Sequence, residues 1–208
     1  MNATLFATAG GRVLLPDRGS LLASRDDGGA LVVVPPRIVW ERSELDAAEL
    51  AGWSFLVAAT GRAMLDTLPQ LEGGCINYWE AGNWALHDAA APPGPKTAPA
   101  FRQMHLHLLG RSRLATRPGW QLGESPRFPA FAERHTWSAG FEPLHAAECR
   151  GIVSQVESRL LQRYGVPPEH IVPWTICARC GYPSAAPAAA APAAAPDCEV
   201  CRAPSADT

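Results

Sequence analysis

The sequence lacks any long hydrophobic run and any strong excess of one charge. Its 208 residues contain no stretch of the ~18 apolar residues that a membrane-spanning helix requires. The residues after Met1 have neither the basic start nor the apolar segment of a secretory signal peptide. A formal net charge of -2 does not favour nucleic-acid binding through a broad basic surface. We therefore expect a cytoplasmic protein that does not act on membranes.

The composition is that of a globular protein. Hydrophobic residues make up 47% of the chain and charged residues 18%, which allows one substantial core. Short apolar segments bounded by turn residues predict strands over 11–16, 20–24 and 30–34. An apolar stripe at helical spacing predicts a helix over about 44–67. Strands followed by a helix favour a sheet with a helix packed on it.

The second half of the chain is more varied. Residues 114–140 lack periodicity and predict an ordered but irregular segment. A second helix is expected between residues 143 and 165, opened by a proline and closed by a glycine. The tract 183–196 is almost entirely alanine and proline, so we expect it to be a mobile arm.

Residues 101–110 place reactive and apolar side chains in alternation. Successive side chains of a strand point to opposite faces, so Gln103, His105 and His107 share one face. The alternate residues, Met104, Leu106 and Leu108, point into a core. The two histidines are ~7 Å apart at Cα, which lets both act on one phosphate or metal. A neutral imidazole, with an ordinary pKa of about 6.5, is a nucleophile at physiological pH.

This alternation resembles the signature of the histidine-triad (HIT) family, His-φ-His-φ-His-φ-φ on a strand, in which φ is apolar. Residues 74–77 are similar to the preceding strand of that family, and residues 30–35 to an earlier apolar strand closed by proline. The expected helix lies between them, as in the family. The resemblance covers about residues 12–113 and implies an α+β fold, with an antiparallel sheet and packed helices.

The sequence departs from the HIT pattern in three places. The first histidine of the triad is replaced by Gln103. The family's Gly-x-Ser before the triad falls on the Ala-Pro-Ala of residues 98–100, and residues of about 84–96 form an apparent insertion. We therefore expect a phosphate-binding loop that is built differently.

The resemblance implies roles for single residues. His105 would be the nucleophile that forms a nucleotidyl-histidine intermediate, and His107 would contact the phosphate or the leaving group. The Gln103 amide can donate a hydrogen bond to a phosphate oxygen, although it cannot act as an imidazolium acid. Arg111 is a candidate for contact with polyphosphate, because guanidinium matches phosphate geometry. The remaining substrate-binding residues implied by the resemblance are Asn77, Leu22 and Ser24.

Together these features predict an enzyme, a nucleotide phosphohydrolase or nucleotidyl transferase acting at the α-phosphate. Its substrates would be nucleoside phosphoramidates, dinucleoside polyphosphates or other adenylated compounds, and a homodimer is a further expectation of the resemblance. Three alternatives stay open. They are a nucleic-acid-associated protein acting on adenylated ends, a non-catalytic nucleotide-binding protein, and an amphipathic strand carrying two surface histidines without function.

Four cysteines near the C-terminus form two Cys-x-x-Cys pairs. Each pair presents two thiolates from a tight turn, and 17 residues separate the pairs (181–197). This spacing predicts a closed, structural Zn²⁺ site of the ribbon type, formed by Cys177, Cys180, Cys198 and Cys201. A thioredoxin-like redox pair is the alternative, but neither pair lies in a βαβ pattern. Cys75 and Cys149 are left over and are expected to be buried thiols.

The chain thus divides into three predicted parts. A HIT-like domain occupies residues 1–131, and a helical extension follows over residues 132–173. A zinc-ribbon tail with an alanine- and proline-rich loop completes the chain over residues 174–208.

Overall fold

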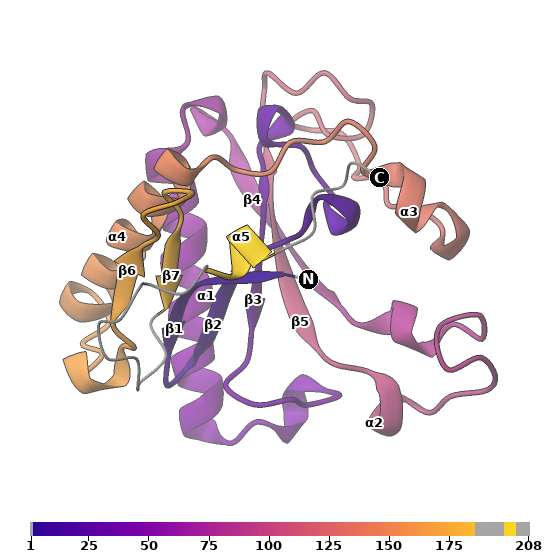
Figure 1. Cartoon of the computed structure of the whole chain (residues 1–208), viewed down its shortest axis with the longest axis horizontal. Helices are drawn as coiled ribbons and strands as arrows, with labels where there is room; N and C mark the ends of the chain where they lie inside the picture. Colours follow the sequence, from indigo (N-terminus) through magenta and orange to yellow (C-terminus); the bar gives the residue numbers. More distant parts are fainter. Residues whose placement is uncertain (1, 186–197, 203–208) are drawn as a thin grey trace.

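A five-stranded antiparallel sheet forms the centre of the protein (Figure 1). The computed structural model describes residues 2–185 and 198–202. The strand order is β1-β2-β3-β5-β4, so the histidine-bearing strand lies between two neighbours. This confirms the expected α+β class. The strands are β1 (Ala3–Thr8), β2 (Gly11–Leu15), β3 (Ala30–Val34), β4 (Cys75–Ala81) and β5 (His105–Arg111).

Two long helices cover one face of the sheet, where Figure 1 shows them on the same side. Helix α1 (Ala47–Thr67) begins at Asp46, whose carboxylate accepts a hydrogen bond from the Glu49 amide at 2.8 Å while Glu49 accepts one from the Asp46 amide at 3.0 Å. This capping box fixes the start of the helix three residues later than the sequence pattern suggested. Helix α4 (Ala146–Gln162) packs beside α1. It also begins later than expected, after the proline at residue 143 that was predicted to open it.

The main core lies between these helices and the sheet. Leucines 106 and 108 of β5 point into it, as the alternation of the strand predicts. They pack with alternate residues of the other strands and with the inner faces of both helices. The contributors include Leu5, Val13, Leu31, Val33, Leu56, Met64, Ile152 and Val156.

The opposite face of the sheet is only partly covered, by irregular segments. The short helices α2 (Ala98–Phe101) and α3 (Arg134–Trp137) belong to these segments (Figure 1). A smaller apolar cluster forms where the segment after β5 folds back over Leu109, with Trp120 at its centre. The structure therefore confirms the ordered, irregular character expected for residues 114–140.

The end of the described chain lies against β1 and α4. Beyond α4, the Ala9 amide donates to the His170 carbonyl at 2.7 Å and the Val172 amide donates to the Ala7 carbonyl at 3.0 Å, so this segment pairs with the outer edge of β1. A two-stranded ribbon follows, and the Tyr182 hydroxyl donates to the Leu144 carbonyl at 2.9 Å. Its elements are β6 (Trp174–Ile176), β7 (Pro183–Ala185) and the short helix α5 (Glu199–Arg202).

Several expectations need correction. Residues 20–24 do not form a strand: Ser20 ends one 3₁₀ turn, and Ser24 directly precedes the next. Strand β5 begins at His105, so Gln103 lies just before it. Cys75 is exposed, not buried, because it lies on the edge strand β4, whereas Cys149 is buried as expected. The 3₁₀ turns are η1 (Arg18–Ser20), η2 (Arg25–Asp27), η3 (Arg42–Glu44), η4 (Pro69–Leu71), η5 (Asn83–Leu86), η6 (Phe131–Glu133) and η7 (Pro168–His170).

Two further expectations concern mobility and membranes. The expected mobile arm 183–196 falls outside the described residues except for its first three, which form β7. Among the described residues, none of the helices has the length and apolar character needed to cross a bilayer.

Candidate functional site

The two histidines of β5 are hydrogen-bonded to each other. The Nε2 atoms of His105 and His107 lie 3.1 Å apart, and the Nδ1 atom of His105 lies 2.9 Å from the main-chain carbonyl oxygen of Gln103. Both imidazoles point away from the main core, as the alternation of the strand requires. The backbone carbonyl of Gln103, two residues before His105, thus fixes the ring of His105.

Burial lowers the pKa of both imidazoles. Removal from water, followed by the effect of neighbouring His105, lowers the pKa of His107 from 6.5 to about 3. Burial also lowers the pKa of His105 below 6.5, and the hydrogen bond to the Gln103 carbonyl partly opposes this. Both rings are therefore neutral at physiological pH.

Neutral rings and a carbonyl acceptor determine where the protons lie. A carbonyl oxygen only accepts, so Nδ1 of His105 carries the hydrogen and its Nε2 carries the lone pair. The hydrogen between the two Nε2 atoms consequently belongs to His107. Nε2 of His105 is therefore an unprotonated, basic nitrogen that accepts a hydrogen bond from the N–H of His107.

Strand pairing extends this site across the sheet. Val32 on β3 lies opposite His107, and Leu14 on β2 lies opposite Val32. On the other side, Trp79 of β4 lies opposite His107, and its ring stacks on the imidazole with centroids 5.4 Å apart. Opposite residues of an antiparallel pair share a face, so these residues form a continuous floor.

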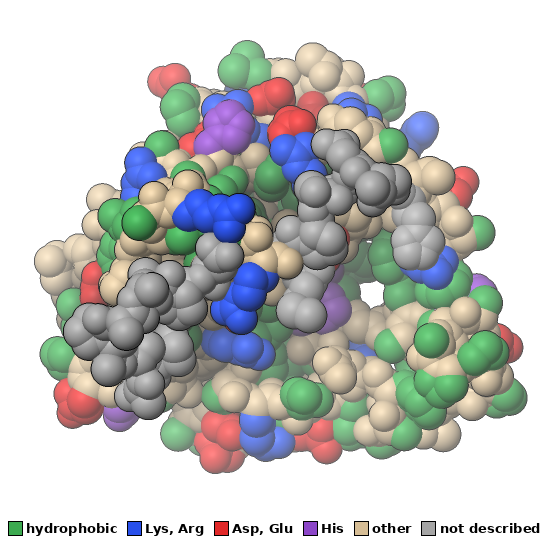
Figure 2. Space-filling view, viewed as in Figure 1, with side chains coloured by type: hydrophobic (Ala, Val, Ile, Leu, Met, Phe, Trp, Pro, Cys, Tyr) green, Lys and Arg blue, Asp and Glu red, His purple; other side chains and the backbone are tan. Residues whose placement is uncertain are grey.

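A pocket of about 970 Å³ lies over this floor. We call it the histidine pocket; its walls come from segments 16–22, 35–38, 82–85 and 101–104. Figure 2 shows the surface hollowed between the part that contains α3 and the part that contains α2. Its size is at the upper end of the ~300–1,000 Å³ usual for small-molecule sites. The pocket therefore has room for more than the phosphate that a histidine would attack.

Some of the residues predicted for this site do line the pocket. Besides the histidines, Gln103 and Leu22 contribute to the lining, although Leu22 comes from an irregular segment and not from a strand. Trp84, in the apparent insertion, also lines the pocket. Asn77 shares the sheet face of His107, because it lies opposite Leu109, but it is one row beyond the pocket lining.

Two other predicted residues stabilise neighbouring loops instead. The Ser24 hydroxyl accepts a hydrogen bond from the Glu142 amide at 3.1 Å. Arg111 is 2% exposed, and its guanidinium donates to the carbonyls of Gly119, Gln121 and Glu124 at 2.8–2.9 Å. Arg111 thus organises the segment after β5, and its donors face the protein interior.

Sequence patterns did not reveal every residue of the pocket. Trp79 and Arg12 line it, and neither was expected there. Trp79 follows Asn77 at strand spacing, so alternation along β4 was a usable signal. Arg12 alternates with apolar residues on β2, but its proximity to the histidines depends on strand order, which the sequence does not state.

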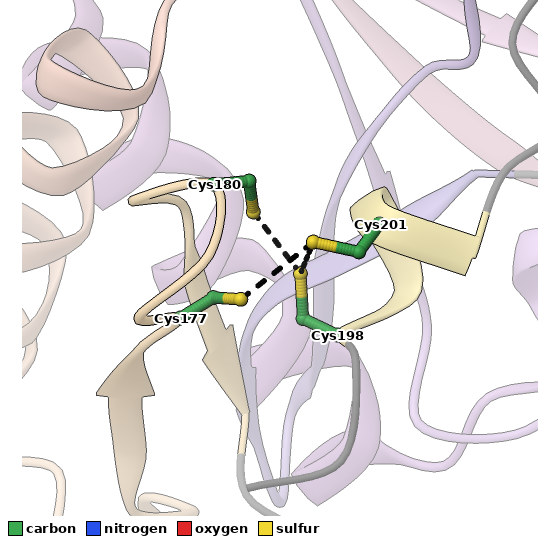
Figure 3. Close-up of side chains that lie close together, drawn as sticks. All are labelled: Cys177, Cys180, Cys198 and Cys201. Carbon is green, nitrogen blue, oxygen red and sulfur yellow. Dashed lines mark hydrogen bonds between the residues drawn. The ribbon is translucent and has the colours of Figure 1, made fainter.

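The four cysteines near the C-terminus come together as predicted, and we call them the cysteine cluster (Figure 3). Cys177 and Cys180 lie in the turn between β6 and β7, Cys198 directly precedes α5, and Cys201 lies within it. Their sulfur atoms are all within 4.8 Å of one another. Three of the separations are 3.3, 3.7 and 3.7 Å.

These separations match a four-thiolate metal site. A tetrahedron with metal–sulfur bonds of ~2.3 Å has sulfur–sulfur edges of about 3.8 Å, whereas a disulfide brings sulfurs to ~2.05 Å. The Gly181 amide donates to the Cys177 carbonyl at 2.8 Å, which closes the turn that carries Cys177 and Cys180. Backbone amides lower the pKa of Cys177 to about 6, so one thiolate forms readily, while burial raises the pKa of Cys180 and Cys201. The cluster can hold one metal ion.

No protein-family model matches this sequence, and no curated protein matches it.

Proposed function

We propose that this protein is a HIT-like nucleotide hydrolase or nucleotidyl transferase that acts at the α-phosphate. The observation that carries the proposal is the lone pair on Nε2 of His105, which lies on the floor of the histidine pocket beside the N–H of His107. A neutral, oriented imidazole in a pocket large enough for a nucleotide has the properties that nucleophilic catalysis requires.

The proposed first step is attack on phosphorus. The Nε2 lone pair of His105 forms the nitrogen–phosphorus bond while the bond from phosphorus to the leaving group breaks, and the leaving group keeps that electron pair. Nδ1 retains its hydrogen and its bond to the Gln103 carbonyl, so the ring becomes positively charged. This charge weakens the new bond and prepares it for the second step.

The second step regenerates the histidine. Water, or an acceptor hydroxyl, attacks phosphorus and loses a proton to solvent, and the electron pair of the nitrogen–phosphorus bond returns to Nε2. His107 changes its hydrogen-bond partner during the cycle. Its N–H donates to His105 at rest and is released to a phosphate oxygen once the lone pair is used.

Residues of the pocket suit a nucleotide in other respects. Leu22 and Leu14 offer apolar surface for a base, together with the indole of Trp84. The exposed Gln103 amide can donate to a non-bridging oxygen at the mouth of the pocket. Asn77, Ser24 and Arg111 are not part of the proposed contacts, since the structure places them outside the lining.

We further propose that the cysteine cluster binds Zn²⁺. Four thiolates at tetrahedral spacing favour zinc over harder cations, and with four protein ligands the ion has a structural role. When bound, zinc would fix the turn of the ribbon to α5. It would thereby hold the tail against β1 and α4.

A panel of adenylated substrates tests the enzymatic proposal. The panel contains an adenosine phosphoramidate, a dinucleoside polyphosphate and an adenylated acid, incubated in ¹⁸O-labelled water. We expect release of adenosine monophosphate with one labelled oxygen on phosphorus, which His105→Ala abolishes. The matched control is His170→Ala, because His170 is exposed and lies far along the chain from the pocket. Binding of nucleotide without turnover of any panel member would favour the non-catalytic alternative.

A further inference from the structure

Arg12 lies in the same transverse row of the sheet as the candidate nucleophile. It pairs with Val34 across β2 and β3, and the register of β3 with β5 sets Val34 opposite His105, one step beyond the pair Val33 and Leu106. Adjacent strands are ~4.8 Å apart, so the Cα atoms of Arg12 and His105 are about 10 Å apart. A long side chain and one phosphate group fill that distance.

The guanidinium of Arg12 is available for a ligand. Arg12 is exposed and lines the histidine pocket, and its guanidinium makes no hydrogen bond or ion pair within the part of the chain that the structure describes. The pocket's other arginine, Arg37, donates to both carboxylate oxygens of Glu49, at 2.8 and 3.1 Å. The carboxylate of the lining, Asp17, lies beyond the opposite end of β2 from Arg12.

To bind a negatively charged phosphate group, the pocket needs a cation other than a protonated histidine. Both imidazoles are neutral, because burial lowers the pKa of each. Arg111, the arginine expected to contact phosphate, donates to three backbone carbonyls in the interior. Arg102, whose charge also acts on His105, is held in ion pairs with Glu41 and Glu80 at 2.9 and 3.5 Å. This leaves the guanidinium of Arg12 on β2 as the candidate cation of the pocket lining.

Neutral histidines also restrict the leaving group. An amine must gain a proton before it departs, and a neutral His107 whose pKa is about 3 holds too little imidazolium to supply one efficiently. A phosphate leaves as an anion and needs no proton. Its developing charge would be stabilised by a guanidinium at the distance of Arg12.

We propose that Arg12 binds the phosphate group that leaves, so that the preferred substrates are nucleotides with a phosphoryl leaving group, such as dinucleoside polyphosphates. This inference rests on the proposed function and deepens it by choosing among its substrate classes. In the step concerned, the His105 nitrogen–phosphorus bond forms, the bridging phosphorus–oxygen bond breaks, and the electron pair stays on the oxygen that Arg12 neutralises. The pocket of about 970 Å³ has room for the additional phosphates.

Kinetics with two leaving groups test this assignment. The ratio of kcat/KM for a dinucleoside tetraphosphate to that for an adenosine phosphoramidate is measured in wild type, Arg12→Gln and Arg163→Gln. We expect Arg12→Gln to lower the ratio about 10- to 100-fold, the effect of losing a charge-assisted hydrogen bond. Arg163→Gln, which removes an exposed arginine at the end of α4, leaves the ratio unchanged. A ratio that Arg12→Gln does not change would overturn the inference.

A binding measurement separates this inference from the proposed function. Calorimetry with inorganic tripolyphosphate reports the anion site without catalysis. We expect Arg12→Gln to weaken binding at least tenfold relative to Arg163→Gln, with unchanged thermal unfolding because Arg12 is exposed. If no substrate is turned over but this difference appears, the proposed reaction fails and the anion site stands. Equal tripolyphosphate binding by both variants would contradict the role of Arg12.

Discussion

The histidine pocket and the cysteine cluster are both built from closely spaced pairs of side chains, but the two sites have different roles. Two histidines at alternate strand positions line a pocket of about 970 Å³, and within the described part of the chain their Nε2 atoms, 3.1 Å apart, are hydrogen-bonded only to each other. Four cysteines at two tight turns point at one another, with all sulfurs within 4.8 Å. Donors that converge leave no open position, whereas donors that face a cavity can react with what enters it. Chemistry is therefore expected at the pocket and stabilisation at the cluster.

Replacing His105 by alanine should have the largest effect of all the substitutions. It should remove activity at the histidine pocket with little change in stability. Loss of the nucleophile is expected to lower kcat/KM at least about 10³-fold. The free energy of unfolding should change by less than about 1 kcal/mol, because the side chain is only partly buried and faces the pocket. Steady-state kinetics and urea unfolding measure the two effects. Normal turnover by this variant would show that His105 is not the nucleophile.

Replacing Cys177 by serine should have the converse effect. A four-thiolate site with one ligand removed holds zinc poorly, so elemental analysis should change from one zinc per chain to none. We expect a lower Tm, while kcat/KM for a small substrate stays within about tenfold, or ~1.4 kcal/mol in the barrier. Cys75→Ser is the matched control, because Cys75 is exposed on β4 and lies outside the cluster.

Either of two results would contradict the separate roles proposed for the cysteine cluster and the histidine pocket. Zinc absent from the wild-type protein would remove the metal proposal. A Cys177→Ser protein that folds but turns over no substrate would show that the tail participates in the active site.

Low pH should lower activity through His105 and stability through His107. Nε2 of His105 is a nucleophile only when unprotonated, so kcat/KM should stay constant from pH 8 to 6.5 and fall at lower pH, since burial lowers this pKa below 6.5. A pH–rate profile with its acid limb above 6.5 would contradict the neutral, buried pair.

The free energy of unfolding should also fall as the pH is lowered. His107 has a folded-state pKa of about 3 against ~6.5 in the unfolded chain, so below 6.5 the unfolded state binds more protons. The stability present above pH 6.5 is therefore lost progressively as pH falls toward 3. Urea unfolding of His107→Gln should show a smaller loss between pH 7 and pH 4 than wild type. If both proteins lose the same stability between pH 7 and pH 4, titrating groups other than His107 cause the loss.

Replacing Gln103 by histidine should have the smallest effect. The atom that orients His105 is the backbone carbonyl of residue 103, which every substitution retains. The exposed side chain contributes at most one hydrogen bond to substrate, so we expect less than about a fivefold change in kcat. An inactive wild-type protein that gains activity with histidine at this position would support the non-catalytic alternative.

Local patterns predicted the elements that local forces determine. Alternation along β5 identified both the core leucines and the outward histidines, because a strand buried on one face has little freedom of register. The Cys-x-x-Cys spacing identified the cysteine cluster, since each tight turn is a local structure. The helix expected over about 44–67 followed from its apolar stripe, but its start at Ala47 depends on the Asp46 cap, which the pattern did not identify.

Features that depend on strand order were not predictable in this way. Arg111 follows the histidines on β5, and only the fold of the segment after it shows that its guanidinium is used by backbone carbonyls. Arg12 is far from His105 in sequence and reaches the pocket because β3 lies between β2 and β5. Residues 20–24 have a strand-like composition, but they turn away beyond β2 and contribute to the pocket wall.

The most direct test of the account is detection of the covalent intermediate. The protein is mixed with an adenylated substrate, quenched at alkaline pH within one turnover, digested and analysed by mass spectrometry. We expect adenosine monophosphate attached to the peptide that contains His105, absent from His105→Ala and present in His170→Ala. Release of adenosine monophosphate by wild type without any adduct on His105, or with the adduct on another residue, would contradict the central claim.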